Sequence, residues 1–141
     1  MANASHEKAG TYLDVQTKLS VENVLNLSEA VAAQLFQRKS GKVPINKVDR
    51  DGRSVSFAIK NLRGGVITRF RATAIPGEDG NTHARVIITA FTTFQRKMLG
   101  IPTESKQLGG WLGYSTFIET LKSVIEDADP SARSSIVIAA G

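Results

Sequence analysis

The sequence lacks cysteine, contains few aromatic residues and has no long apolar run. Its 141 residues include no Cys and 6% aromatic residues. The absence of Cys excludes disulfides, Cys-ligated zinc, iron–sulfur clusters and thiol nucleophiles. No apolar stretch approaches the roughly 18 residues that a membrane span needs. Hydrophobic residues make up 41% of the chain and charged residues 22%, which argues against intrinsic disorder. These proportions predict a soluble globular protein.

The N-terminal segment carries no recognisable targeting signal. Residues 1–8 contain no cationic stretch followed by an apolar core, so we expect neither a signal peptide nor a lipid anchor, and the expected location is the cytoplasm. The pattern of the remaining chain predicts a flexible N-terminal tail over 1–10, a single domain over 11–130 and a C-terminal tail over 131–141.

Positive charge is concentrated in the middle of the chain. The formal net charge is +5, but residues 38–106 carry 14 basic and five acidic groups, a net charge of +9, whereas the segments on either side are acidic. Because this middle segment also reads as a β-sheet, we expect basic charge on a sheet surface.

The first half of the chain reads as a strand, a helix and four further strands. Residues 11–19 alternate in polarity as a half-buried strand does, and Ser20 is placed to cap a helix that runs to about Arg38, with Ser40-Gly41 as its stop. Turn-forming residues then separate four strand candidates, over 42–48, 54–62, 66–75 and 82–94.

A two-residue turn at Gly64-Gly65 sets the first register that we predict. It places Ile59 opposite Phe70 and Phe57 opposite Ala72, so that the apolar faces coincide. With the same parity, the next hairpin puts three apolar residues of the last strand beside three of its neighbour. These predicted pairs are Val86 with Ala72, Ile88 with Phe70, and Ala90 with Thr68.

The C-terminal part reads as a loop, a long helix and a short apolar tail. Apolar residues recur at helical spacing from Trp111 to Ala128, Asp129-Pro130 ends the helix, and Gly109-Gly110 lets the chain bend into it. The tail around Ile136 could add a strand, cover exposed sheet or fray.

This order predicts an α+β domain of the form β-α-β-β-β-β-α, with a curved antiparallel sheet gripped by the long C-terminal helix. The succession of elements over residues 11–129 resembles the helix-grip architecture of START-related (SRPBCC) proteins and, more broadly, the repeat of the TATA-binding protein. The segment from Ile101-Pro102 through Gly109-Gly110 to Asp129-Pro130 also looks like the C-terminal part of small uncharacterised bacterial proteins. Neither likeness carries a functional residue.

Catalysis and metal binding fit the sequence poorly. The only histidines are His6, in the N-terminal tail, and His83, beside a turn, where a solvated role is the simpler interpretation. Glu126, Asp127 and Asp129 cluster at a helix C-terminus, and we expect salt bridges to the basic sheet there, rather than a metal site. The sequence therefore indicates no catalytic residue, metal site or cofactor.

The leading functional hypothesis is a non-enzymatic module that binds a small apolar ligand between sheet and helix. The helix-grip resemblance favours such a cavity, and small residues face large ones there. The alternative is that these side chains simply fill the core, because protein interiors default to close packing. The candidate lining residues are Phe57, Phe70, Ala72, Ile88, Trp111, Tyr114 and Phe117. An enzyme that uses a cavity tyrosine or His83 is a third possibility.

The runner-up is binding of nucleic acid or another polyanion by the outer sheet face. The predicted register collects Lys60, Arg69, Arg71 and Arg85 on that face, with Arg63, Arg96 and Lys97 as extensions. No row of aromatic residues for base stacking accompanies them. The alternative interpretation is an ordinary solvated surface.

The same register predicts an apolar strip on the basic face. Ile87 and Phe91 point outward in it, and exposed apolar strips mark contacts with other surfaces. A homodimer could form through this face, or through the tail at Ile136 and Ile138 by strand addition.

Overall fold

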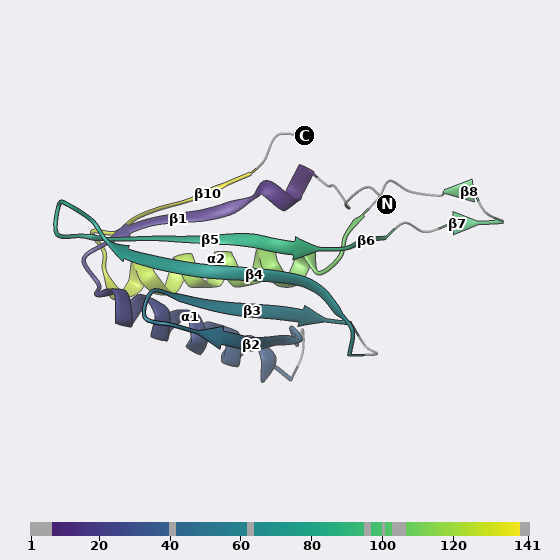
Figure 1. Ribbon diagram of the computed structural model, residues 1–141, viewed down its shortest axis with the longest axis horizontal. Helices are drawn as coiled ribbons and strands as arrows, with labels where there is room; N and C mark the ends of the chain where they lie inside the picture. Colours follow the sequence, from purple (N-terminus) through teal and green to yellow (C-terminus); the bar gives the residue numbers. More distant parts are fainter. Residues whose placement is uncertain are drawn as a thin grey trace.

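The computed structural model describes residues 7–39, 42–61, 64–94, 97–99, 101–102 and 107–138. Its main body is one six-stranded antiparallel sheet in the order β10-β1-β5-β4-β3-β2, with the two α-helices packed against one face (Figure 1). The predicted α+β class and the order strand, helix, four strands, helix are confirmed.

The main body contains two α-helices of 16 and 18 residues and six sheet strands of 5 to 11 residues. The helices and sheet strands are β1 (Tyr12–Thr17), α1 (Val21–Phe36), β2 (Ile45–Arg50), β3 (Ser54–Lys60), β4 (Val66–Pro76), β5 (Thr82–Phe91), α2 (Trp111–Ala128) and β10 (Arg133–Val137). A 3-10 helix, Glu7–Gly10, precedes β1. Between β5 and α2, β6 (Thr93–Phe94) pairs with β9 (Gln107–Leu108), and β7 (Lys97–Met98) pairs with β8 (Ile101–Pro102).

Local chemistry explains where both helices begin. The Ser20 hydroxyl accepts a hydrogen bond from the backbone N–H of Asn23 at 3.1 Å, so Ser20 is the predicted N-cap. Gly110 precedes α2 with φ of 74°, and a side chain on it would collide with Thr68. A glycine is therefore required at this bend, as predicted.

The tail takes the first of the three outcomes left open by the sequence. β10 pairs antiparallel with β1, with Ile136 opposite Leu13, and so forms one edge of the sheet. At the opposite edge, β2 contains an irregularity between Lys47 and Asp49 that breaks its alternation.

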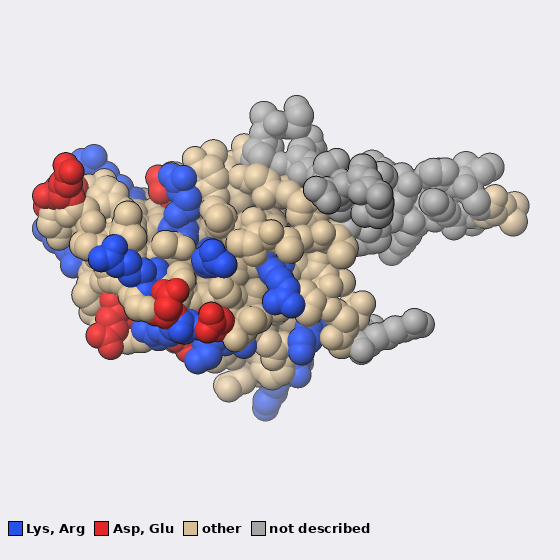
Figure 2. All heavy atoms as spheres, in the orientation of Figure 1, with Lys and Arg blue, Asp and Glu red and all other residues tan. Residues whose placement is uncertain are grey.

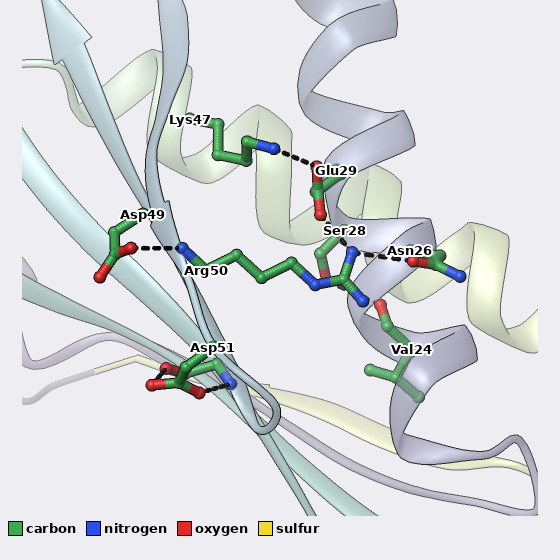
Figure 3. Close-up of polar contacts among 9 residues, drawn as sticks. Val24, Asn26, Ser28, Glu29, Lys47, Asp49, Arg50 and Asp51 are labelled. Atoms are coloured by element: carbon green, nitrogen blue, oxygen red, sulfur yellow. Dashed lines mark hydrogen bonds and ion pairs between the residues drawn. The ribbon is translucent and has the colours of Figure 1, made fainter.

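The irregular edge strand is tied to α1 by an ion-pair cluster that we call the edge clasp (Glu29, Lys47 and Arg50; Figure 3). Glu29 of α1 pairs with Lys47 Nζ at 3.0 Å and with the Arg50 guanidinium, which also donates to Asn26 Oδ1 at 2.8 Å. The hydrogen bonds from Arg50 and Lys47 lower the pKa of Glu29. Charged residues on the helix side of β2 are thus paired, and they also protect the sheet edge.

The predicted register of the β3–β4 hairpin is wrong by two residues. Phe57 lies opposite Phe70 and Ile59 opposite Thr68. The turn is longer than two residues, because the backbone N–H of Asn61 donates to the carbonyl of Gly65, and the pairing shifts between Ile59 and Lys60. A slip of two keeps side-chain parity, so the predicted faces are still correct.

The β4–β5 register is confirmed for two of its three predicted pairs. Val86 lies opposite Ala72 and Ile88 opposite Phe70, but a bulge follows, and Thr68 pairs with Phe91 instead of Ala90. Directly opposed residues share a face, so Phe91 belongs to the helix side with the buried Thr68. The prediction that Phe91 points outward beside Ile87 is therefore wrong.

Candidate functional site

The residues predicted to line an apolar cavity form the centre of the core. Four aromatic residues of this set are fully buried: Phe57, Phe70, Tyr114 and Phe117. The centroid of the Phe70 ring lies 5.3 Å from that of Phe57, 4.8 Å from that of Phe117 and 5.3 Å from that of Tyr114. Ala72 is buried as well, and Ile88 and Trp111 are partly buried against the cluster. Such ring contacts are typical of a close-packed core.

Tyr114 is anchored at its polar end too. Its hydroxyl lies 2.7 Å from the carbonyl oxygen of Thr11 and 3.1 Å from that of Val86. Burial raises the pKa of this phenol above its ordinary value. The side chain thus links α2 to β5 and to Thr11, the residue just before β1, which is a structural role.

Neither α-helix covers the other side of the sheet, which we call the open face. It is formed by outward positions on the strands, among them Tyr12, Asp14, Gln16, Ser54, Ser56, Lys60, Arg69, Arg71, Thr73, Ile75, His83, Arg85 and Ile87. Figure 2 shows Lys and Arg side chains over the left and central parts of this view, whereas the acidic side chains lie in its left half.

The structure brings the four predicted cations onto this face but gives them different surroundings. Arg69 and Arg71 are both exposed and lie two residues apart on β4, so both point to the same side of the sheet. Arg71 Nε donates to Ser56 Oγ at 3.3 Å. Within the described residues, no carboxylate forms an ion pair with Lys60, Arg69 or Arg71.

Arg85 is already engaged. Its guanidinium lies 3.4 Å from Asp14 Oδ1 and 4.5 Å from the centroid of the Tyr12 ring, on the neighbouring strand. Arg63 and Arg96 lie outside the described residues, as does the side chain of Lys97. The described open face thus has unpaired positive charge at Lys60, Arg69 and Arg71 on its central strands. Arg133, opposite Gln16 on β10, adds a further exposed cation at the edge.

The open face is hollowed around Arg85. A shallow depression of about 270 Å³ lies over β1, β5 and β4 and is lined by Asp14, Thr73, Ile75, His83 and Arg85. Ile75 and Ile87 are exposed by 45% and 40%, so apolar groups contribute to the surface.

His83 has the solvated position that the sequence favours. The side chain is exposed, and its Nε2 lies 3.5 Å from Asp79 Oδ1 in the β4–β5 turn. His6 lies outside the described residues. Among the residues that the structure describes, no group of three His, Asp or Glu side chains is arranged to hold a metal ion.

Sequence reasoning misplaced the carboxylates at the end of α2. Asp129 is buried and accepts hydrogen bonds from the hydroxyls of Thr17 and Ser131, each at 2.6 Å, and from the Lys18 backbone N–H at 2.8 Å. Glu126 binds Lys122 of its own helix at 2.9 Å. The prediction that these residues form salt bridges to the basic sheet is therefore wrong for Asp129 and Glu126. The sequence Asp129-Pro130-Ser131 is typical of a turn in which the Asp side chain accepts local hydrogen bonds, and it could have indicated this role.

Comparison with known proteins assigns no family to the chain. No model of a known protein family matches the chain, and no curated protein matches its sequence significantly. Neither of the described helices has the length and apolarity needed to cross a membrane.

Proposed function

We propose that the protein is a binding module for a nucleic-acid strand, which its open face holds by the phosphates. The observation that carries this proposal is the presence of Lys60, Arg69 and Arg71 on an uncovered sheet, where none of them forms an ion pair with a described carboxylate. Asp51 in the β2–β3 turn interacts electrostatically with Arg71 without forming an ion pair with it. Like charges without local partners repel one another, and an anionic chain offsets that repulsion.

Phosphates, rather than bases, are the better ligand for this face. Of the aromatic residues, Tyr12 lies on it with Arg85 over its ring, and the register moves Phe91 to the helix side. Base-specific or stacking recognition needs exposed rings. We therefore expect binding that depends little on sequence and strongly on salt.

An apolar ligand between sheet and helix remains the second candidate. The element order resembles helix-grip proteins, which favours a cavity on the helix side. Against it, Phe57, Phe70, Tyr114 and Phe117 already contact one another. A ligand there would require these rings to move apart, so we rank this function below the open face.

The proposal is tested with the double variant Arg69→Ala, Arg71→Ala in a fluorescence anisotropy titration against a single-stranded oligonucleotide. Charge-assisted contacts contribute enough that we expect affinity to fall by about tenfold or more. Because each phosphate contact adds roughly 0.7 to the slope of log affinity against log salt for a single strand, the slope should decrease by about 1.4.

The matched control is Arg38→Ala, Lys39→Ala. These two exposed residues follow α1 and carry the same charge, so the variant has the same net charge as the test variant. We expect wild-type affinity and slope from it. If both variants lost the same affinity, net charge alone would explain the binding and the proposal would be contradicted. An unchanged affinity in the test variant would also refute the proposal.

A further inference from the structure

A second, smaller cleft lies where three distant segments of the chain meet. At the left of Figure 1, the end of β1 approaches the β4–β5 hairpin and the connection from α2 to β10. The cleft has a volume of about 260 Å³ and is lined by Gln16, Thr17, Lys18, Asn81, Ser131 and Arg133. All six lining residues are polar or charged, in contrast to the apolar core.

The buried Asp129 carboxylate holds two of the residues that line this cleft, Thr17 and Ser131, in place. The Thr17 and Ser131 hydroxyls both donate their protons to its carboxylate, at 2.6 Å each. The Ser131 and Lys18 backbone N–H groups donate to it as well, at 3.1 and 2.8 Å. One buried carboxylate thus connects α2 with the end of β1, and the Ser131 oxygen is left to accept hydrogen bonds from a ligand.

Two cations line the cleft without an ion-pair partner. Within the described residues, neither Lys18 nor Arg133 forms an ion pair, although several carboxylates lie on the adjoining elements. The nearest of these carboxylates have other hydrogen-bond partners. Asp129 accepts the four hydrogen bonds given above, and Asp79 accepts from Gln16 Nε2 at 2.5 Å and from the Asn81 N–H at 3.0 Å. Glu126 accepts hydrogen bonds from Lys122 and Ser134.

We propose that this cleft binds a small anion that also carries hydroxyl groups, such as a sugar phosphate or polyol phosphate. Lys18 and Arg133 supply the charge for the phosphate, and Ser131 accepts a hydrogen bond from a ligand hydroxyl. The volume is below the roughly 300–1,000 Å³ of drug-sized pockets, so the ligand is small. This site is separate from Arg69 and Arg71 and does not depend on the nucleic-acid proposal.

The test is a titration of the full chain with glycerol 3-phosphate, followed by amide NMR spectra. We expect saturable shifts confined to the amides of residues 16–18, 81 and 131–133. Inorganic phosphate should shift the same amides with lower affinity, because it lacks the hydroxyls, and glycerol alone should not. Shifts spread evenly over the surface, or none at these amides, would overturn the proposal.

Paired variants sharpen the test. Lys18→Gln, Arg133→Gln removes both cations from exposed positions and should weaken glycerol 3-phosphate binding by about tenfold or more. Arg38→Gln, Lys39→Gln, with the same change in net charge, should bind as wild type does. The double variant Arg69→Ala, Arg71→Ala should bind glycerol 3-phosphate as the wild type does, so the test of this cleft is independent of the test of the open face. Undiminished binding by the Lys18, Arg133 variant would contradict the assignment.

Discussion

The two faces of the sheet differ in almost every physical respect, although they are built from the same strands. Phe70 is fully buried beneath α2, whereas its neighbour Arg71 is exposed on the open face. Ile88 packs against the core, and Ile87, one residue away, is 40% exposed. Strand alternation thus separates a face that packs against the helices from a face that is exposed.

The comparison shows where substitutions should affect stability and where they should affect binding alone. The helix face contains stacked aromatic rings and a buried tyrosine with two carbonyl contacts. The open face contains exposed side chains whose removal leaves no cavity. The following comparisons set a buried or paired residue against an exposed residue of the same kind.

The largest expected effect comes from removing an aromatic ring of the core. Phe70→Ala should lower the free energy of unfolding by about 3–5 kcal/mol, because it removes a ring in contact with three others. Ile87→Ala, on the open face, should cost about 1 kcal/mol or less. Urea denaturation measures both, and similar losses would show that the two faces are not energetically distinct.

The next effect concerns Asp129 and depends on pH. Hydrogen bonds from Ser131 and Thr17 hold the pKa of Asp129 well below its ordinary value of 3.8. A carboxyl whose pKa is lower in the folded state stabilises the protein above the unfolded pKa, and this stabilisation is lost as the pH falls through the folded pKa. Asp129→Asn should therefore destabilise the protein at neutral pH and reduce its further loss of stability in acid.

The control for Asp129 is Asp79→Asn in the exposed β4–β5 turn. Its pKa is also lowered, chiefly by the Asn81 N–H, but the residue lies in solvent. We expect a much smaller change in the urea midpoint between pH 7 and pH 3. Equal changes for the two variants would mean that Asp129 does not hold α2 to β1.

A smaller effect is expected at the edge clasp. Arg50→Ala removes the bonds to Glu29 and Asn26, and partly exposed ion pairs of this kind contribute about 1 kcal/mol. Arg53→Ala, in the same hairpin but exposed, should change stability by less than about 0.5 kcal/mol. Thermal unfolding distinguishes them, and an Arg50→Ala protein with the stability of wild type would show that the clasp only shields the edge.

The sequence predicted the element order and the parity of the faces because both follow from local periodicity. It missed the bulge before Phe91 because residues 86–91 are almost all apolar, so no break in alternation marks the extra residue. It also missed the longer turn after Lys60, because Gly64-Gly65 by itself favours a two-residue turn. The cations of the open face were found from parity alone.

Partners across long sequence separations could not be predicted. The Arg85 pair with Asp14 depends on how β5 lies against β1, and Asp129 binds Thr17 across 112 residues. The sequence therefore identified which cations face outward, whereas the structure was needed to separate the paired Arg85 from the unpaired Arg69.

The most direct test of the difference between the faces is an amide NMR map of the wild-type protein during titration with a single-stranded oligonucleotide. We predict shifts that concentrate on the outward positions around Lys60, Arg69 and Arg71, and that weaken as salt is added. Shifts centred on α1 and α2, or no shifts at low salt, would contradict the assignment of binding to the open face.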